Sequence, residues 1–163
     1  MKILVLSDNH GNSNDMLEVL RRVKPVDMVI HCGDIDMPPS LLEESAGCPV
    51  KIVRGNNDYN YSKELPSELI VNAGKTKIFV THGHTYFVNF NLDRLTLTAL
   101  EKGATIAMYG HTHIPKSDYV NGVYVFNPGS ISYPRQAERR GTYGMVDIDE
   151  KGKRPPEFSI CYL

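Results

Sequence analysis

Five short apolar segments of this sequence each lead into a side chain that can bind a metal ion. The last segment, residues 106–108, is followed by Tyr109-Gly110 and then by His111 and His113. A short apolar run predicts a buried strand, and where that strand opens into a loop both imidazoles can face one cavity. The other four runs are followed by Asp8 and His10 (after 3–6), Asp34 (after 28–30), Asn56 (after 52–53) and His82 (after 78–80). The pattern predicts a fold in which several strand ends meet at one metal site.

The first 55 residues alternate between strand and helix patterns. Apolar runs predict strands at 2–6, 28–31 and 49–54. Between the first two runs, Asn12 or Ser13 can cap a helix that Pro25 stops. Between the second and third, Pro38-Pro39 can start a short helix that Gly47 ends. This alternation predicts parallel strands joined by right-handed crossovers.

The rest of the chain has shorter strand patterns and one further helix. We expect strands at 68–72, 77–81, 105–109, 116–120, 123–126, 142–148 and 157–162, and a helix capped by Asn91 and ended by Gly103. Asn121-Gly122 predicts a tight hairpin turn. The expected fold is one α/β domain over residues 1–163. It consists of two facing sheets flanked by helices, parallel in its N-terminal part and antiparallel in its C-terminal part.

Composition excludes several other classes of protein. A chain of 163 residues can bury one core, and its 18 basic and 19 acidic residues leave no electrostatic footprint for nucleic acid or an anionic membrane. The apolar run at 3–6 is too short for a signal peptide or a membrane span. Cys32, Cys48 and Cys161 have no CxxC spacing, which favours free thiols. We therefore expect a cytoplasmic protein that binds neither membranes nor nucleic acid.

The seven candidate donors define the chemistry of the site. They supply imidazole nitrogen and carboxylate or amide oxygen without thiolate, which suits Mn²⁺, Fe²⁺, Ni²⁺ or Zn²⁺. Seven ligands exceed what one ion takes, and a bridging carboxylate would divide them between two ions about 3.5–4 Å apart. Two such ions can share a hydroxide and hold a phosphoryl group for in-line attack.

These motifs together resemble the calcineurin-like metallophosphoesterase superfamily, and most closely its small single-domain phosphodiesterases. The resemblance runs in order through Asp8-Asn9-His10, Gly33-Asp34, Gly55-Asn56-Asn57-Asp58, Thr81-His82-Gly83-His84, Gly110-His111-Thr112-His113, Asn127-Pro128-Gly129-Ser130 and Pro134-Arg135. It implies a four-layer α/β/β/α fold. It also implies two metal ions, Mn²⁺ first among the candidates. Asp8, His10 and His113 would hold the first, and Asn56, His82 and His111 the second. Asp34 would bridge the two.

One position departs from the wider superfamily. The residue after the ligand asparagine is often a histidine that aids the leaving group, whereas here it is Asn57, which cannot transfer a proton near neutral pH. The small phosphodiesterases commonly lack this histidine too, so the departure favours them over phosphoprotein phosphatases. Leaving-group stabilisation would then fall to the metals, to water or to His84.

Other polar residues near these motifs could have either a structural or a functional role. For His31 a hydrogen-bonded structural role is favoured over metal binding, and Asp36 and Asp58 are expected to orient ligands or cap turns. Asn127 and Ser130 are expected to hydrogen-bond the histidine loop. Arg135 either contacts a substrate phosphate or has no role in the site and merely follows the turn at Pro128-Gly129, which reverses the chain. The basic clusters Arg139-Arg140 and 151–154 are expected to be solvated surface.

The main functional hypothesis is a dinuclear phosphodiesterase acting on a small phosphoester. A phosphomonoesterase or nucleotide pyrophosphatase would share the same metal chemistry. The fold also resembles a retromer subunit that serves as a protein-binding scaffold, but that branch typically lacks the ligand found here at His10. Tyr59, Tyr61 and Tyr86 could floor a substrate pocket. Contacts in a homo-oligomer, a dimer or tetramer, are the slightly favoured use for them.

Overall fold

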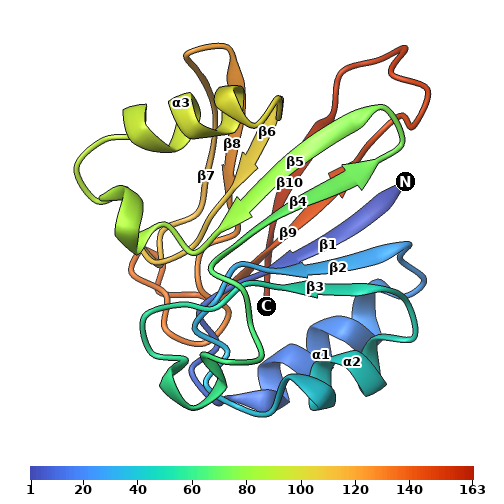
Figure 1. Ribbon diagram of the computed structural model, residues 1–163. Helices are drawn as coiled ribbons and strands as arrows, with labels where there is room; N and C mark the ends of the chain where they lie inside the picture. Colours follow the sequence, from blue (N-terminus) through green and yellow to red (C-terminus); the bar gives the residue numbers. More distant parts are fainter.

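Two five-stranded sheets face each other in the computed structural model, which describes residues 1–163 (Figure 1). The first sheet has the order β10 (Glu157–Tyr162), β9 (Thr142–Asp147), β1 (Lys2–Leu6), β2 (Met28–His31), β3 (Val50–Ile52). The second has the order β4 (Glu68–Ala73), β5 (Thr76–Thr81), β6 (Ile106–Met108), β8 (Val123–Asn127), β7 (Lys116–Val120). The expected two-sheet α/β architecture is confirmed.

Each sheet is mixed and contains one run of three parallel strands. In the first sheet β1 pairs in parallel with β2, and β2 with β3, while β9 and β10 add antiparallel strands. In the second sheet β6 pairs in parallel with both β5 and β8, and β4 and β7 are antiparallel edges. Parallel pairing therefore extends beyond the N-terminal part to which the sequence analysis had confined it.

Helices cover the outer faces of both sheets. The helices α1 (Ser13–Val23) and α2 (Pro39–Ala46) lie on the first sheet, and α3 (Asp93–Glu101) lies on the second (Figure 1). As expected, Asn12 accepts a hydrogen bond from the backbone N–H of Asp15, and Gly47 ends α2 in the left-handed conformation. The N-cap of α3 is Leu92, and Asn91 instead accepts from the backbone N–H of Asp93. Two short 3₁₀ helices, η1 (Tyr59–Tyr61) and η2 (His84–Tyr86), lie in loops.

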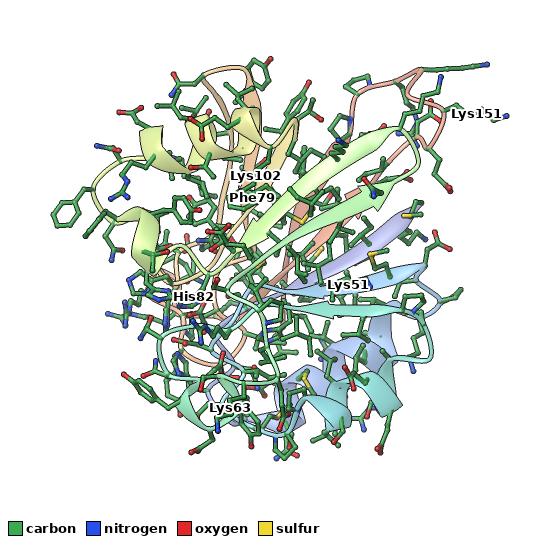
Figure 2. The ribbon with its side chains drawn as sticks, viewed as in Figure 1. Lys51, Lys63, Phe79, His82, Lys102 and Lys151 are labelled. Carbon is green, nitrogen blue, oxygen red and sulfur yellow. The ribbon has the colours of Figure 1, made fainter.

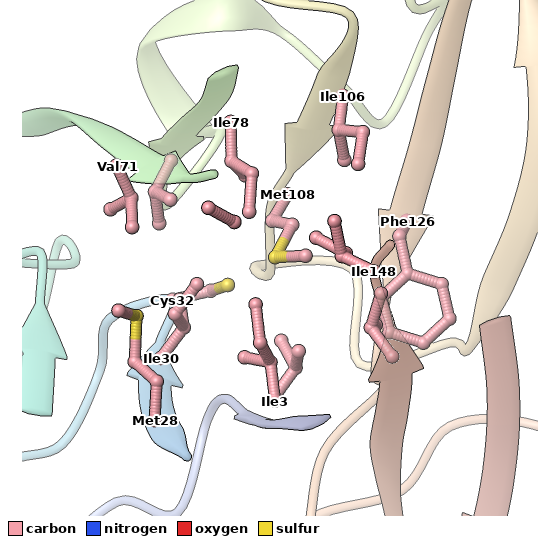
Figure 3. Close-up of a cluster of buried hydrophobic side chains, with 14 of the residues drawn as sticks. Ile3, Met28, Ile30, Cys32, Val71, Ile78, Ile106, Met108, Phe126 and Ile148 are labelled. Atoms are coloured by element: carbon pink, nitrogen blue, oxygen red, sulfur yellow. The ribbon is translucent and has the colours of Figure 1, made fainter. Parts of the chain in front are cut away.

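The inner faces of the two sheets share one apolar core. Figure 3 shows Ile3 and Ile30 of the first sheet opposite Ile78, Met108 and Phe126 of the second. All five side chains are fully buried. Burial of this apolar area stabilises the packing of sheet on sheet and fixes the strand ends relative to one another.

Three side-chain environments bear on the earlier expectations. Tyr86 is only 9% exposed and packs edge-on against Phe79, so the expected role for it in an oligomer contact is wrong. Tyr61 is half-buried and packs against the core beneath α1 and α2. Tyr59 is exposed. All three cysteines are free, as expected. No helix of the structure has the length and apolar character needed to cross a membrane.

Candidate metal centre

The loops that follow β1, β2, β3, β5 and β6 meet at one edge of the two-sheet sandwich (Figure 1). His82, labelled in Figure 2, follows β5 directly and is fully buried. Because these strands run in parallel within each sheet, their carboxyl ends lie together, and the loops bring side chains from distant parts of the chain into contact. The seven donors expected from the sequence are all found in these loops: Asp8, His10, Asp34, Asn56, His82, His111 and His113.

The first group of donors consists of Asp8, His10 and His113. His113 Nε2 lies 3.2 Å from Asp8 Oδ1 and 3.3 Å from His10 Nε2. His113 Nδ1 lies 2.7 Å from the carbonyl oxygen of Tyr133, to which it donates its proton. That hydrogen bond leaves the lone pair on Nε2, directed at the other two donors, as metal-binding histidines require. This trio can hold a metal ion.

The second group is centred on His82. His82 Nδ1 donates to the carbonyl oxygen of Cys32 at 2.8 Å, which leaves the lone pair on Nε2. His82 Nε2 lies 3.1 Å from Asn56 Oδ1 and 3.4 Å from Asp34 Oδ2. The ring of His111 lies with its centroid 5.2 Å from that of His82. Asp34 Oδ2 also lies 3.8 Å from His10 Nε2, so this carboxylate reaches both groups.

Asp8 has an orphaned acceptor at the centre of the site. Its Oδ2 accepts hydrogen bonds from the hydroxyl of Ser7 and the backbone N–H of His111. Its Oδ1 is buried without a hydrogen bond, although it lies 3.2 Å from His113 Nε2 and 4.0 Å from His82 Nε2. A buried ionised oxygen without a partner costs several kcal/mol, on the order of 1–3 even for a neutral group. A bound cation would satisfy it, so the residues fit a metal ion.

Electrostatics favours the ionised form of both carboxylates. Burial alone would raise the pKa of Asp8, but the neighbouring imidazoles of His113 and His82 and the hydroxyl of Ser7 outweigh it and lower the pKa. The same balance lowers the pKa of Asp34, where His82 and the N–H groups of Asn57 oppose burial. Burial and the neighbouring His82 lower the pKa of His111, which favours its neutral, metal-binding form. The pKa of His82 is raised, because Asp34 and Asp8 outweigh its burial.

The backbone of the site is strained. Five of the seven donors have a positive φ: Asp8 (56°), His10 (45°), Asp34 (53°), His111 (68°) and His113 (59°). Residues with a β-carbon rarely adopt this conformation, and where they do the strain concentrates at functional sites. The strand ends thus turn sharply enough to aim successive side chains into one cavity.

Asp58 and Asn57 hold the Asp34 loop in place. The buried carboxylate of Asp58 accepts backbone N–H groups from Asp34 (2.8 Å), Asp36 (2.7 Å) and Gly55 (2.7 Å). This confirms the expected orienting role for Asp58. The Nδ2 of Asn57 donates to Asp34 Oδ2 at 2.7 Å, and its backbone N–H donates to Asp34 Oδ1 at 2.8 Å. Asn57 therefore acts on Asp34, through which it contributes to the site.

The histidine loop is fixed by Asn127, as expected. Its Nδ2 donates to the carbonyl oxygen of Gly110 at 2.9 Å and to Thr112 Oγ1 at 3.0 Å. Ser130 behaves differently, since its hydroxyl donates to the carbonyl oxygen of Asp8 at 2.7 Å and so fixes the loop after β1. Asn127, at the end of β8, and Ser130, in the loop after it, thus contact two different donor loops.

Two pockets flank the donors. On one side His84 lines a pocket of about 270 Å³ with Arg54, Asn56 and Tyr59. The ring of His84 lies 5.3 Å from that of His82, and its Nδ1 is buried without a partner. On the other side a pocket of about 540 Å³ is lined by His10, Asp36, His113, Tyr133, Pro134, Arg135 and Arg139. The sequence analysis did not single out Arg54 or Arg139 for the site, because neither falls in a motif.

Comparison with known proteins agrees with this geometry. A model described as the calcineurin-like phosphoesterase superfamily domain matches residues 1–151. The chain belongs to this superfamily. Its sequence is 34% identical over 150 residues to a probable metallophosphoesterase, YsnB, of Bacillus subtilis, covering 91% of this chain and 85% of the relative. It is 29% identical over 174 residues to the phosphodiesterase YfcE of Escherichia coli, covering 91% of this chain and 89% of the relative.

Solved structures of other proteins show the same architecture. A predicted phosphoesterase from Streptococcus pneumoniae superposes with a TM-score of 0.80 at 36% identity, covering 99% of this chain and 97% of the other. Vps29 of Entamoeba histolytica, in a complex with zinc, superposes with a TM-score of 0.76 at 18% identity, covering 99% of each chain. The second likeness shows the fold alone.

Proposed function

We propose that this member of the calcineurin-like phosphoesterases is a metal-dependent phosphodiesterase with two divalent cations in the candidate metal centre. The observation that carries the proposal is the unpartnered, buried Oδ1 of Asp8, which faces imidazole nitrogens from His82 and His113. Each histidine already uses its other nitrogen on a backbone carbonyl, so the nitrogens that face Asp8 are free to bind metal.

The proposed ligand sets follow the family resemblance. Asp8, His10 and His113 hold one cation, Asn56, His82 and His111 hold the other, and Asp34 bridges. The bridging role is supported by the two distances from Asp34 Oδ2, 3.8 Å to His10 Nε2 and 3.4 Å to His82 Nε2. Two cations held there would lower the pKa of water and neutralise charge on the phosphoryl oxygens. Oxygen and nitrogen ligands suit Mn²⁺, Ni²⁺, Fe²⁺ and Zn²⁺, and we place Mn²⁺ first because of the family resemblance.

The remaining residues position the substrate and its leaving group. Arg135 lines the larger pocket beside His10 and His113, where its guanidinium can contact a phosphoryl oxygen. His84 lies on the opposite side, and burial lowers the pKa of its imidazole, so that it is neutral near pH 7. We assign it a hydrogen bond to the departing oxygen. Asn57 supports the reaction through Asp34, to which both of its N–H groups donate.

A diester is favoured over a monoester by the groups around the centre. No side chain beside Asn56 can deliver a proton to a poor leaving group, since Asn57 occupies that position. The two flanking pockets offer room for the two arms of a diester. Among the relatives, the E. coli protein is named as a phosphodiesterase. The retained His10, 3.3 Å from His113, weighs against the scaffold alternative.

The test is the initial rate on bis(p-nitrophenyl) phosphate and on p-nitrophenyl phosphate after chelation and reloading with Mn²⁺, Ni²⁺, Fe²⁺ or Zn²⁺. We expect metal-dependent diester hydrolysis that exceeds monoester hydrolysis and is lost in Asp34→Asn. The rate on substituted phenyl diesters should depend steeply on the leaving-group pKa. A faster monoester rate would move the assignment to a phosphomonoesterase. Metal binding without turnover of either ester would favour the scaffold.

A further inference from the structure

The larger of the two pockets includes side chains that have no role in metal binding or in contact with the reacting phosphoryl group. Its wall beyond His10 and His113 is formed by the segment after Ser130, including Tyr133, Arg135 and Arg139. Its volume of about 540 Å³ exceeds that of a single phosphoryl group and lies within the range of small-ligand sites, about 300–1,000 Å³. The pocket opens from the metal centre, so a ligand in it would be attached to the reacting phosphate.

Two guanidinium groups line this pocket without an internal counter-ion. Neither Arg135 nor Arg139 forms an ion pair within the chain, whereas Arg154 pairs with both Asp147 and Glu157. The side chain of Arg139 reaches only the carbonyl oxygen of Pro134, at 3.4 Å. Asp36 lines the same pocket, so two guanidiniums face one carboxylate there. The balance is positive, and it favours an anionic group on the ligand.

Tyr133 adds a fixed aromatic surface to these charges. Its backbone carbonyl oxygen accepts from His113 Nδ1, and its backbone N–H donates to Ser130 Oγ at 2.8 Å. Its ring meets His10 edge-on, with centroids 5.3 Å apart, yet 55% of the residue is exposed. The backbone of Tyr133 is thus fixed, and its exposed ring beside His10 offers an aromatic surface on which a base can stack.

We propose that this pocket is a substrate subsite for a nucleotide-like arm that carries a second phosphate. The aromatic base of this arm stacks on Tyr133, and the second phosphate binds Arg139. Arg135 lies between the second phosphate and the reacting phosphate. The inference rests on the proposed phosphodiesterase function and narrows its substrate class. The arm is a nucleoside with a further phosphate, which distinguishes the substrate from simple aryl or alkyl diesters.

Two chromogenic diesters that differ by one phosphate test the subsite. Thymidine 5′-(p-nitrophenyl phosphate) and its 3′-phosphorylated form release the same leaving group from the same bond. We expect kcat/KM to be about tenfold higher for the 3′-phosphorylated form, as for one charge-assisted hydrogen bond at a solvent-accessible site. The ratio should shrink as salt rises from about 0.02 M to about 1 M, because screening weakens the contact.

Variants identify the residue responsible for the preference. Arg139→Gln should bring the kcat/KM ratio of the two diesters close to one. Arg140→Gln is the matched control, because Arg140 donates to the carbonyl oxygen of Leu163 at 3.1 Å and stacks over Tyr162 instead of lining the pocket. Arg140→Gln should leave the kcat/KM ratio of the two diesters as it is in the wild type. Equal kcat/KM for both diesters in the wild type, or a ratio that Arg139→Gln leaves unchanged, would overturn the proposal while the phosphodiesterase function stands.

A binding measurement keeps the test independent of turnover. Calorimetry on the Mn²⁺-loaded protein compares thymidine 3′,5′-bisphosphate with thymidine 5′-phosphate. The bisphosphate should bind about tenfold more tightly to the wild type and to Arg140→Gln, but not to Arg139→Gln. Equal affinities would overturn the subsite. If no diester were hydrolysed yet the bisphosphate preference remained and depended on Arg139, the subsite would stand and the proposed catalytic function would fail.

Discussion

His31 shows how a single buried side chain organises the loops beneath the metal centre. Its Nδ1 accepts the backbone N–H of Gly33 at 3.2 Å, so the proton is on Nε2, which donates to Asn9 Oδ1 at 2.9 Å. Both nitrogens are used within the chain, which confirms the structural role favoured from the sequence. Burial, opposed in part by Asp58 and Asp8, lowers the pKa of His31 to about 4.

The low pKa of His31 predicts acid instability of the metal-free protein. The folded pKa of about 4 lies below the ordinary value of 6.5, so protons bind preferentially to the unfolded chain. The contribution of His31 to the free energy of unfolding is complete above pH 6.5 and is lost as pH falls toward 4. Urea unfolding between pH 7 and pH 4 should therefore show a smaller loss in His31→Gln than in the wild type. Equal pH slopes for the two proteins would contradict this.

Asp58 is predicted to contribute more to stability than its neighbour Asp36. Asp58→Asn replaces one acceptor oxygen by an N–H group that faces backbone donors of Asp34, Asp36 and Gly55. We expect a loss of about 2–3 kcal/mol in the free energy of unfolding, measured with urea. Asp36→Asn is the control, because the Asp36 side chain is exposed and makes no hydrogen bond in the chain. Similar losses in both variants would show that the carboxylate of Asp58 does not hold the Asp34 loop in place.

At this scale the donor types were predictable and their backbone geometry was not. Several histidines and aspartates that each follow an apolar run together predict a metal site by their chemistry. The positive φ of Asp8 or His113 has no such signal, because residues with a β-carbon adopt it only where tertiary contacts impose it. Arg139 is exposed, as expected, but its place in the pocket had no signal in the sequence, because it depends on how the loop after β8 folds back.

Among the elements, the loop after β6 is packed directly against the loop after β1. A β-carbon at Gly110 would overlap Ser7 Oγ and lie 2.7 Å from Asp8 Oδ2. Glycine is therefore required at this position by close approach of the two loops. The contact links a ligand loop of the second sheet to a ligand loop of the first.

Gly110→Ala should displace Asp8 and weaken metal binding. We expect a loss of about 1–3 kcal/mol in the free energy of unfolding together with a lower affinity for Mn²⁺, measured by calorimetry. Gly122→Ala is the matched control, since Gly122 has a φ of +85° but nothing within 4 Å of its added β-carbon. It should lose roughly 1 kcal/mol with unchanged Mn²⁺ affinity. Unchanged affinity in Gly110→Ala would show that Asp8 is not constrained there.

The elements themselves were largely predictable, but one pairing was not. Caps and turn residues such as Asn12, Gly47 and Asn121-Gly122 indicate where helices and hairpins begin and end, and the structure agrees. The parallel pairing of β6 with β8 skips β7, which lies between them in sequence and forms the edge. Hydrophobic periodicity gives the existence of strands but not their order, which is decided by packing of the whole sheet.

Over the whole molecule, the metal centre joins the two sheets. Asp8, His10, Asp34 and Asn56 come from loops of the first sheet, and His82, His111 and His113 from loops of the second. The unfolded chain cannot bring these residues together, so a metal ion held by them would bind the folded state selectively. Binding is therefore expected to stabilise the packing of one sheet on the other.

Removing the metal should lower the melting temperature. With Mn²⁺ at about a hundred times its dissociation constant, one site adds about 2.7 kcal/mol, which corresponds to roughly 5–10 °C for a chain of this size. Circular dichroism melts with and without a chelator measure the shift. Asp34→Asn should show a much smaller shift than the wild type. A melting temperature that does not respond to chelation would mean that the donors bind no metal that matters to the fold.

Counting the Mn²⁺ ions bound to the chelator-stripped protein tests the dinuclear centre itself. Calorimetric titration, with paramagnetic resonance to detect coupling between neighbouring ions, should give two coupled Mn²⁺ ions per wild-type chain. Asp34→Asn should weaken both sites together, whereas Asp118→Asn, at an exposed position on β7, should retain two ions. Two tightly bound ions in Asp34→Asn, or a single ion in the wild type, would contradict a centre bridged by Asp34.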